Sequence, residues 1–205
     1  MKHFSQFGED YVLEAIFKDK HDGFFLDVGA HNGVTDSNTL MLEQMGWKGI
    51  CIEPHSRYFR ELKINRKAEC HNVVAWDEEI DKVAFHETKP GGWSRVNGGG
   101  KHATVNITYP PSTTLNKILG GRYNNIDFVS IDVEGHEWHV LNGWTLNKYE
   151  PRIILVEDLT HNGEYDSYFK GYTPTYGWKQ GKGGSNVWYT NSEEDLDKVR
   201  RLYRG

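Results

Sequence analysis

The sequence has few cysteines, no long apolar run and no excess of basic residues. Its two cysteines, Cys51 and Cys70, are too few for a disulfide framework or a metal knuckle. We expect both to be free and buried in a protein of the cytoplasm. No stretch approaches the roughly 18 consecutive apolar residues of a membrane span, and residues 1–6 lack the pattern of a signal peptide. The net charge of −5 disfavours a dedicated nucleic-acid-binding protein.

Predicted helices and strands alternate along most of the chain. We expect helices at residues 9–17, 37–45, 56–66, 113–119, 137–141 and 193–204. We expect strands at residues 24–28, 49–53, 70–75, 82–87, 104–108, 128–132, 152–157 and 186–190. Alternation of this kind indicates an α/β fold with a parallel sheet. The strand at 186–190 should pair antiparallel at the sheet edge, and residues 1–205 should form a single domain.

Two features of composition bear on the substrate side of this domain. A glycine-rich insertion at about residues 89–103 should hold no regular element, and is either a mobile flap over the site or a hairpin tip. A second glycine-rich turn is expected at residues 181–184. The chain has seven tryptophans and eleven tyrosines. Most should pack in the core and at its edges, while one or two are available to face a flat ligand such as a sugar ring.

Residues 24–33, FFLDVGAHNG, are the most informative segment. They predict a buried strand, a glycine turn and the start of a helix, with Gly29 and Gly33 allowing a sharp turn and a close approach of ligand to backbone. The order Asp27, Gly29, Gly33 differs from the G-x-G-x-x-G fingerprint of dinucleotide binding. An acid in place of the first glycine favours a cofactor without a phosphate. A carboxylate can bind an ammonium or a hydroxyl, which fits S-adenosylmethionine (SAM) better than NAD.

Four acids, Asp27, Glu53, Asp132 and Glu157, each close a predicted parallel strand. The carboxyl ends of parallel strands meet on one rim, where open α/β sheets bind ligands. A single aspartate there could cap a helix, but four like charges need ligands or hydrogen-bond donors to compensate them. We therefore predict that this rim is the functional site. Glu53 is placed to accept hydrogen bonds from ribose hydroxyls.

A second dense cluster follows the strand predicted at 128–132. Asp132 and His136 are candidate general bases there, although His136 could equally be a histidine satisfied by its loop. Asp132 with Glu157, or with Asp158, could hold a divalent cation such as Mg²⁺ through oxygen ligands. The sequence does not require such an ion.

Motifs in a fixed order resemble those of the FkbM-type family of SAM-dependent methyltransferases. They are SQFGED at 5–10, LDVGAHNG at 26–33, SNT at 37–39, CIEP at 51–54, IDVEGHE at 131–137 and ILVE at 154–157. The resemblance implies a Rossmann-like class I methyltransferase fold. That fold has a mostly parallel seven-stranded sheet with an antiparallel last strand, helices on both faces and, in this chain, a β-hairpin insertion.

The resemblance also implies roles for individual residues. The loop from Asp27 to Gly33 would hold the methionine part of SAM, Glu53 the ribose, and residues 75–77 would lie beside the adenine, with Gln6 covering the cofactor. The expected cofactor contacts are Gln6, Asp27, Gly29, Ala30, Asn32, Gly33, Asn38, Glu53, Ala75, Trp76 and Asp132.

Many relatives resemble enzymes that methylate hydroxyls of sugars or small natural products. We therefore predict O-methylation of a sugar, glycan or small molecule, with the protein aligning the partners and Asp132 or His136 taking the proton. The alternatives are an RNA ribose methyltransferase, an NAD-dependent oxidoreductase and a non-catalytic SAM-binding module. No membrane or nucleic-acid partner is expected, and the acceptor and the oligomeric state stay open.

Overall fold

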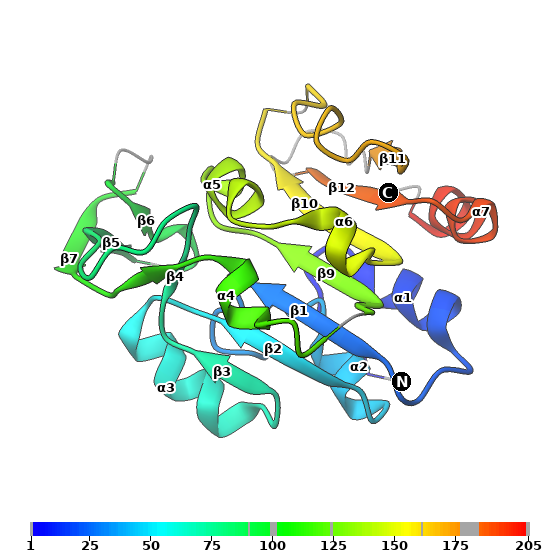
Figure 1. The fold of residues 1–205 in the computed structure, drawn as a ribbon. Coiled ribbons are helices and arrows are strands. Elements are labelled where there is room, and N and C mark those ends of the chain that lie inside the picture. Colours follow the sequence, from blue (N-terminus) through cyan, green and yellow to red (C-terminus); the bar gives the residue numbers. More distant parts are fainter. Residues whose placement is uncertain are drawn as a thin grey trace.

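The computed structural model describes residues 2–89, 91–98, 102–123, 125–160, 162–176 and 185–203. Its centre is a seven-stranded sheet (Figure 1). In spatial order its strands are β11 (Thr173–Tyr176), β12 (Ser185–Thr190), β10 (Ile153–Asp158), β9 (Phe128–Ile131), β1 (Phe24–Val28), β2 (Lys48–Ile52) and β3 (Glu69–His71). β10, β9, β1, β2 and β3 are parallel, whereas β12 is antiparallel to both of its neighbours. The predicted fold class is confirmed.

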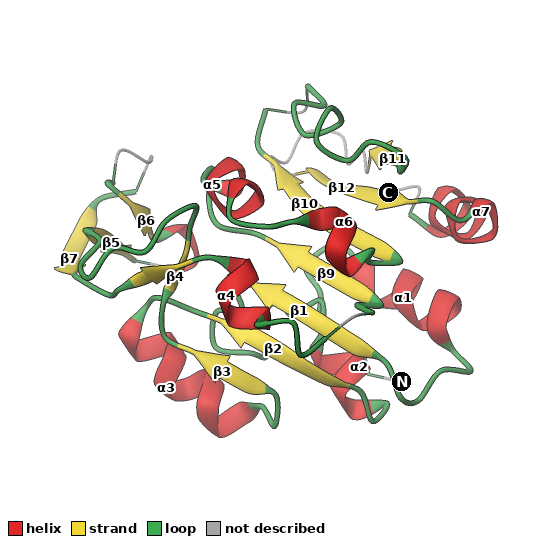
Figure 2. Cartoon of the chain, in the orientation of Figure 1, coloured by secondary structure: helices red, strands yellow, loops and turns green. Residues whose placement is uncertain are grey.

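Helices cover both faces of this sheet (Figure 2). One core contains residues of α4 (Leu115–Leu119), α5 (Glu137–Asn142) and α6 (Leu146–Tyr149). The other contains residues of α1 (Glu9–Phe17), α2 (Leu40–Gln44), α3 (Ser56–Asn65) and α7 (Glu193–Leu202). Because successive side chains of a strand point to opposite faces, Leu26 packs in the first core and Phe25 in the second. Within the described residues, no helix is long and apolar enough to cross a bilayer.

The strand expected at residues 70–75 is split between two sheets. Its first part is β3, and its second part, β4 (Val74–Ala75), pairs in parallel with β8 (Ser112–Thr113). Between them the Asn72 side-chain amide donates to the backbone oxygens of Glu53 (2.8 Å) and Pro54 (3.0 Å). These two bonds turn the chain away from the main sheet and toward the carboxyl end of β2.

Two other boundaries differ from expectation. The helix expected at 37–45 begins only at Leu40, and the Ser37 hydroxyl accepts the Leu40 N–H at 3.1 Å in the turn before it. The position of β12 at the sheet edge was wrong, since β11 pairs on its outer side and forms the edge. The sequence of β11 contains Pro174, which disfavours a strand in general but is tolerated on an edge.

The glycine-rich insertion is more ordered than predicted. Its described part holds a short 3₁₀ helix, η1 (Gly91–Trp93), and β6 (Arg95–Val96), so the expectation of no regular element was wrong. β6 pairs with β5 (Phe85–Thr88), which also pairs with β7 (Thr104–Thr108), giving a three-stranded antiparallel sheet. Figure 1 shows this small sheet on the side toward which β1, β9 and β10 point. The turn expected at 181–184 lies outside the described residues.

The two ends of the chain meet at Glu9. The buried Glu9 carboxylate accepts hydrogen bonds from the side-chain amide of Asn186 (2.7 Å) and the hydroxyl of Tyr203 (3.0 Å). Both cysteines are free thiols, as predicted, and they are in-register neighbours on β2 and β3. Cys51 is buried as expected, whereas Cys70 is only half-buried.

Candidate functional site

A cavity of about 480 Å³ lies at the carboxyl ends of the parallel strands. The residues predicted to contact a cofactor that line it are Gln6, Asp27, Gly29, Ala30, Asn38, Glu53, Ala75, Trp76 and Asp132. His136 and Glu157 line it as well. Asn32, Gly33 and Asp158 are not among its lining residues. One space therefore brings together most of the predicted site.

The two glycines of the first loop have different neighbours. Gly29 has φ +92°, and a Cβ there would lie 1.7 Å from the backbone oxygen of Asp132. Its missing side chain allows the loop after β1 to meet the loop after β9. A Cβ on Gly33, at φ +78°, would lie 2.6 Å from Cγ of Arg66, so this glycine makes room for a buried arginine. Asn32 stabilises the same loop by accepting the Val34 and Thr35 amides at 3.0 and 2.8 Å.

The Asp27 carboxylate is held by the side chains of Thr39 and Arg66. The Thr39 hydroxyl donates to its carboxylate at 2.5 Å, and the Arg66 guanidinium lies 3.9 Å away. The Arg66 side chain is fully buried and also pairs with Glu43 at 3.1 Å. Burial raises the pKa of Asp27, while Arg66 and Thr39 oppose that rise. Asp27 is therefore a fixed acid on the cavity wall.

Glu53 is fixed by the backbone on both of its oxygens. One oxygen accepts the His31 N–H at 2.8 Å and the other accepts the His55 N–H at 2.7 Å. Burial raises the pKa of Glu53 to about 7, although these two bonds oppose the rise. The His31 ring packs on Tyr58 with centroids 3.9 Å apart, and both line the cavity beside Glu53. Nothing in the sequence spacing predicted this aromatic pair.

The N-terminal segment contributes Gln6 and Phe7 to the cavity lining. Two buried acids at the start of α1 fix it. Asp10 accepts the Ser5 hydroxyl at 2.6 Å, and Glu9 accepts the Phe7 N–H at 2.9 Å. The SQFGED motif therefore anchors its first residues through its last two.

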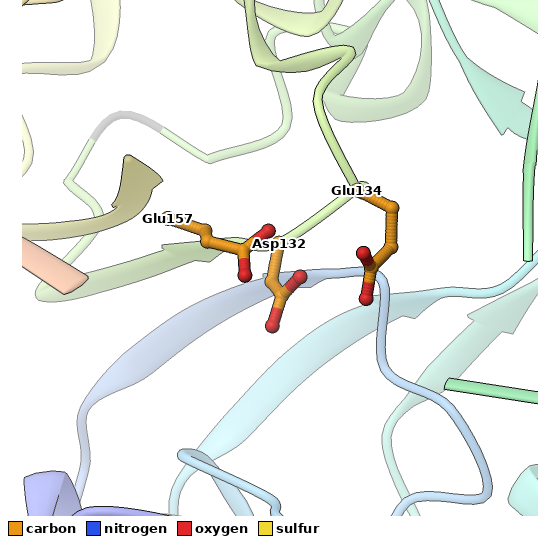
Figure 3. Close-up of side chains that lie close together, drawn as sticks. All are labelled: Asp132, Glu134 and Glu157. Carbon is orange, nitrogen blue, oxygen red and sulfur yellow. The ribbon is translucent and has the colours of Figure 1, made fainter. Parts of the chain in front are cut away.

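Asp132, Glu134 and Glu157 form a three-acid cluster in the cavity (Figure 3). One carboxylate oxygen of each lies within 4.8 Å of the other two. Asp132 directly follows β9, Glu134 sits in the next turn with φ +59°, and Glu157 lies near the end of β10. Oε2 of Glu157 is buried without a hydrogen-bond partner in the described part of the chain.

Glu134, and not Asp158, completes the cluster with Asp132 and Glu157. Neighbouring residues of a strand face opposite ways, so Glu157 and Asp158 cannot both point into the cavity. The Asp158 carboxylate instead accepts the amides of Thr160 (3.0 Å) and Gly163 (3.1 Å) in the following loop. A cluster with oxygen ligands only is of the type that Mg²⁺ prefers, but cation binding here stays a prediction.

The three acids lie close together at the cavity wall, and the pKa of each is raised. Burial, and next the charge of Glu137, raise the pKa of Asp132 to about 7. Burial, and next Asp132, raise the pKa of Glu134 to about 8, and the pKa of Glu157 is also well above its usual range. Glu137 itself supports the loop, accepting the Val133 and Gly135 amides at 3.1 Å each. The pKa of each of the three cavity acids is therefore higher than that of a carboxyl group in water.

The family of the chain follows from comparison with known proteins. The sequence profile described as the methyltransferase FkbM domain matches residues 27–181. This chain belongs to the FkbM methyltransferase domain family. Among curated protein sequences, none matches it.

Solved structures share the fold of this FkbM domain at low sequence identity. A precorrin-6y C5,15-methyltransferase from Geobacter metallireducens is 10% identical with a TM-score of 0.50, over 88% of this chain and 87% of that one. A TehB-like SAM-dependent methyltransferase from Corynebacterium glutamicum is 10% identical, also at 0.50, over 91% and 88%. The human methyltransferase 10 domain containing protein is 10% identical at 0.51, over 90% and 80%. These likenesses establish the fold and nothing about the acceptor.

In this FkbM domain His136 connects the loop after β9, residues 132–136, to the insertion. We call this loop, which carries Asp132 and Glu134, the acid loop. Nε2 of His136 lies 3.0 Å from the backbone oxygen of Val96. A carbonyl oxygen only accepts, so Nε2 carries a proton and the neutral ring keeps its free lone pair on Nδ1. Burial lowers the pKa of His136, which favours that neutral form. The ring centroid lies 5.4 Å from that of Trp76, which stacks on His139 at 3.6 Å.

Proposed function

We propose that this FkbM domain transfers a methyl group from SAM to a hydroxyl group of a sugar, glycan or small molecule. The observation that carries the proposal is the cavity itself. It combines Glu53, an acid fixed at the end of β2, with the three-acid cluster and His136.

The residues fit the cofactor by the chemistry of their donors and acceptors. Each oxygen of Glu53 accepts one backbone N–H and keeps a lone pair for a ribose hydroxyl. Asp27 and Asp132 provide negative charge for the ammonium and sulfonium groups. Ala75 and Trp76 would flank the adenine, Gln6 would close over it, and Asn38 would contact the methionine part. SAM supplies a methyl group already activated by its positively charged sulfur.

The protein must orient the acceptor and take up a proton. Asp132, with a pKa of about 7, is close to the value that suits a general base at neutral pH. The Nδ1 lone pair of His136 is the second candidate, and both groups line the same cavity. Methyl transfer then needs alignment of the hydroxyl oxygen with the methyl carbon, which a rigid cavity provides.

Calorimetry with SAM, S-adenosylhomocysteine (SAH) and NAD tests the cofactor. We expect saturable binding of the two adenosyl compounds and none of NAD. Glu53→Gln should weaken SAH binding at least about tenfold, since loss of a charged hydrogen bond costs about 1.5–3 kcal/mol. The matched control is Glu194→Gln, an exposed acid on α7, which should bind like the unaltered protein. Absence of SAH binding, or preference for NAD, would overturn the proposal.

Transfer of a radiolabelled methyl group separates an enzyme from a binding module. Incubation with labelled SAM and pooled hydroxylated small molecules should give a labelled product that Asp132→Asn reduces strongly. The rival acceptor is RNA. The acid-lined cavity and the net charge of −5 disfavour binding of the RNA phosphates. A salt-dependent gel shift with RNA would instead favour RNA as the acceptor.

A further inference from the structure

Resting on the proposed function, we propose that Trp93 and the three-acid cluster form the acceptor subsite. The acceptor is a sugar ring. Its apolar face stacks on the Trp93 indole, and its hydroxyl groups hydrogen-bond to Asp132, Glu134 and Glu157.

Trp93 presents a large aromatic ring to the cavity. It lies on η1 in the insertion, lines the cavity and is 43% exposed. Its ring is stacked on His102, with centroids 4.0 Å apart and an interplanar angle of 12°. One face is therefore covered and the ring orientation is held, while exposed surface remains for a ligand. A tryptophan of this kind supplies contact area at low conformational cost.

The segment that directly follows Trp93 touches the acid loop. Val96 accepts the His136 hydrogen bond at 3.0 Å. The Arg95 guanidinium lies against Gly135, because a Cβ there would be 2.7 Å from its Nη2. Gly135 is the neighbour of Glu134 in the loop. The aromatic ring and the acids are therefore tied together by the contacts that join the insertion to the main sheet.

The acids match an acceptor with several neighbouring hydroxyls. Three carboxyl oxygens lie within 4.8 Å of one another, and Oε2 of Glu157 is buried without a hydrogen-bond partner among the described residues. A buried polar atom without a partner is destabilising, and a hydrogen bond from a ligand hydroxyl would offset that loss. A carboxyl group near its pKa accepts and donates hydrogen bonds, as a hydroxyl does. A phenol offers one hydroxyl to three acids, whereas a sugar ring offers adjacent hydroxyls together with an apolar face.

Saturation-transfer NMR on the SAH-loaded protein tests this subsite. The probes are the methyl glycosides of glucose, galactose, mannose, fucose and rhamnose, with sorbitol and catechol as comparison compounds. We expect at least one glycoside to bind, with the strongest saturation on its C–H protons, and sorbitol to bind at least about tenfold more weakly. Trp93→Ala should reduce glycoside affinity at least about tenfold, and Trp93→Phe should keep it within about threefold.

Calorimetry of SAH on the same variants separates the two proposals. If SAH does not bind the unaltered protein, the proposed function fails. If SAH binds equally to all variants but no glycoside binds, or the Ala variant binds glycosides as well as the unaltered protein, the acceptor subsite is wrong. Trp93-dependent binding of catechol alone would also overturn it, in favour of a phenolic acceptor. Glu134→Gln is the second arm and should weaken glycoside binding without loss of SAH.

Discussion

The Asp132 backbone oxygen occupies the space where a side chain on Gly29 would begin, 1.7 Å from an ideal Cβ. Neither backbone segment can move without disturbing a central strand, so Gly29→Ala should cost about 3–5 kcal/mol of unfolding free energy. The matched control is Gly171→Ala, which has the same φ of +92° and no atom of the described residues within 4 Å of the added Cβ. It should lose only the backbone strain, about 1–2 kcal/mol. Urea denaturation measures both, and equal losses would contradict the contact.

Removing the buried arginine under the first loop should be far more costly than removing an exposed one. Arg66→Met leaves Asp27 and Glu43 buried without their cation, which typically costs about 3–5 kcal/mol. Arg57→Met breaks an exposed helical pair with Glu61 and should cost at most about 0.5 kcal/mol. Denaturant midpoints compare the two variants. A small loss in the Arg66 variant would show that Asp27 does not depend on this cation.

Stability without ligand should fall as pH rises, between about pH 4 and 7 through Asp132 and between about pH 4.5 and 8 through Glu134. The pKa values of Asp132 (about 7) and Glu134 (about 8) are raised by folding, so the folded state holds protons that the unfolded chain has lost. Deprotonation therefore disfavours the folded state, by at most about 1.4 kcal/mol per pH unit for Glu134 and by less for Asp132, whose side chain is exposed to solvent. The pKa of His136 is lowered, which acts in the opposite direction below about pH 6.5.

The variant Glu134→Gln tests the origin of that pH dependence. It cannot lose a proton, so its unfolding free energy should fall less steeply between pH 7 and 8 than that of the unaltered protein. Thermal or urea unfolding at three pH values suffices. An identical slope in both proteins would mean that Glu134 is already ionised at pH 7.

The two neighbouring thiols should differ in reactivity. The Cys51 thiol hydrogen-bonds to Cys70, which raises the pKa of Cys51 and lowers that of Cys70. The thiolate is the reactive form, and only Cys70 is partly accessible. Iodoacetamide on the native protein should therefore label Cys70 at least about tenfold faster than Cys51, as peptide mass spectrometry can measure. Equal rates after denaturation provide the control.

The sequence predicted the central strands and the acids at their carboxyl ends, because both follow from the periodicity of apolar residues. Apolar runs located the central strands, and the rule that parallel strands share a rim placed Asp27, Glu53, Asp132 and Glu157 in one cavity. Side-chain bonds between distant residues carry no such signal. The amide of Asn72 that splits a predicted strand is an example, because its partners lie 18 and 19 residues away.

The site was incompletely predicted for similar reasons. Which of two consecutive acids faces the cavity depends on the register of β10, so Asp158 was considered where Glu134 completes the cluster. Gly33 has the spacing of a ligand loop, yet its space is taken by Arg66, a contact across 33 residues. Trp93 lies in a glycine-rich segment, for which the sequence predicted no regular element although the structure has η1 and β6 there.

The bond network at Glu9 has a consequence for synthesis on the ribosome. The segment bearing Gln6 is made well before the partners of Glu9, because Asn186 and Tyr203 follow Glu9 by 177 and 194 residues. The hydrogen bonds from Asn186 and Tyr203 to Glu9 therefore form only after β12 and α7 have emerged from the ribosome.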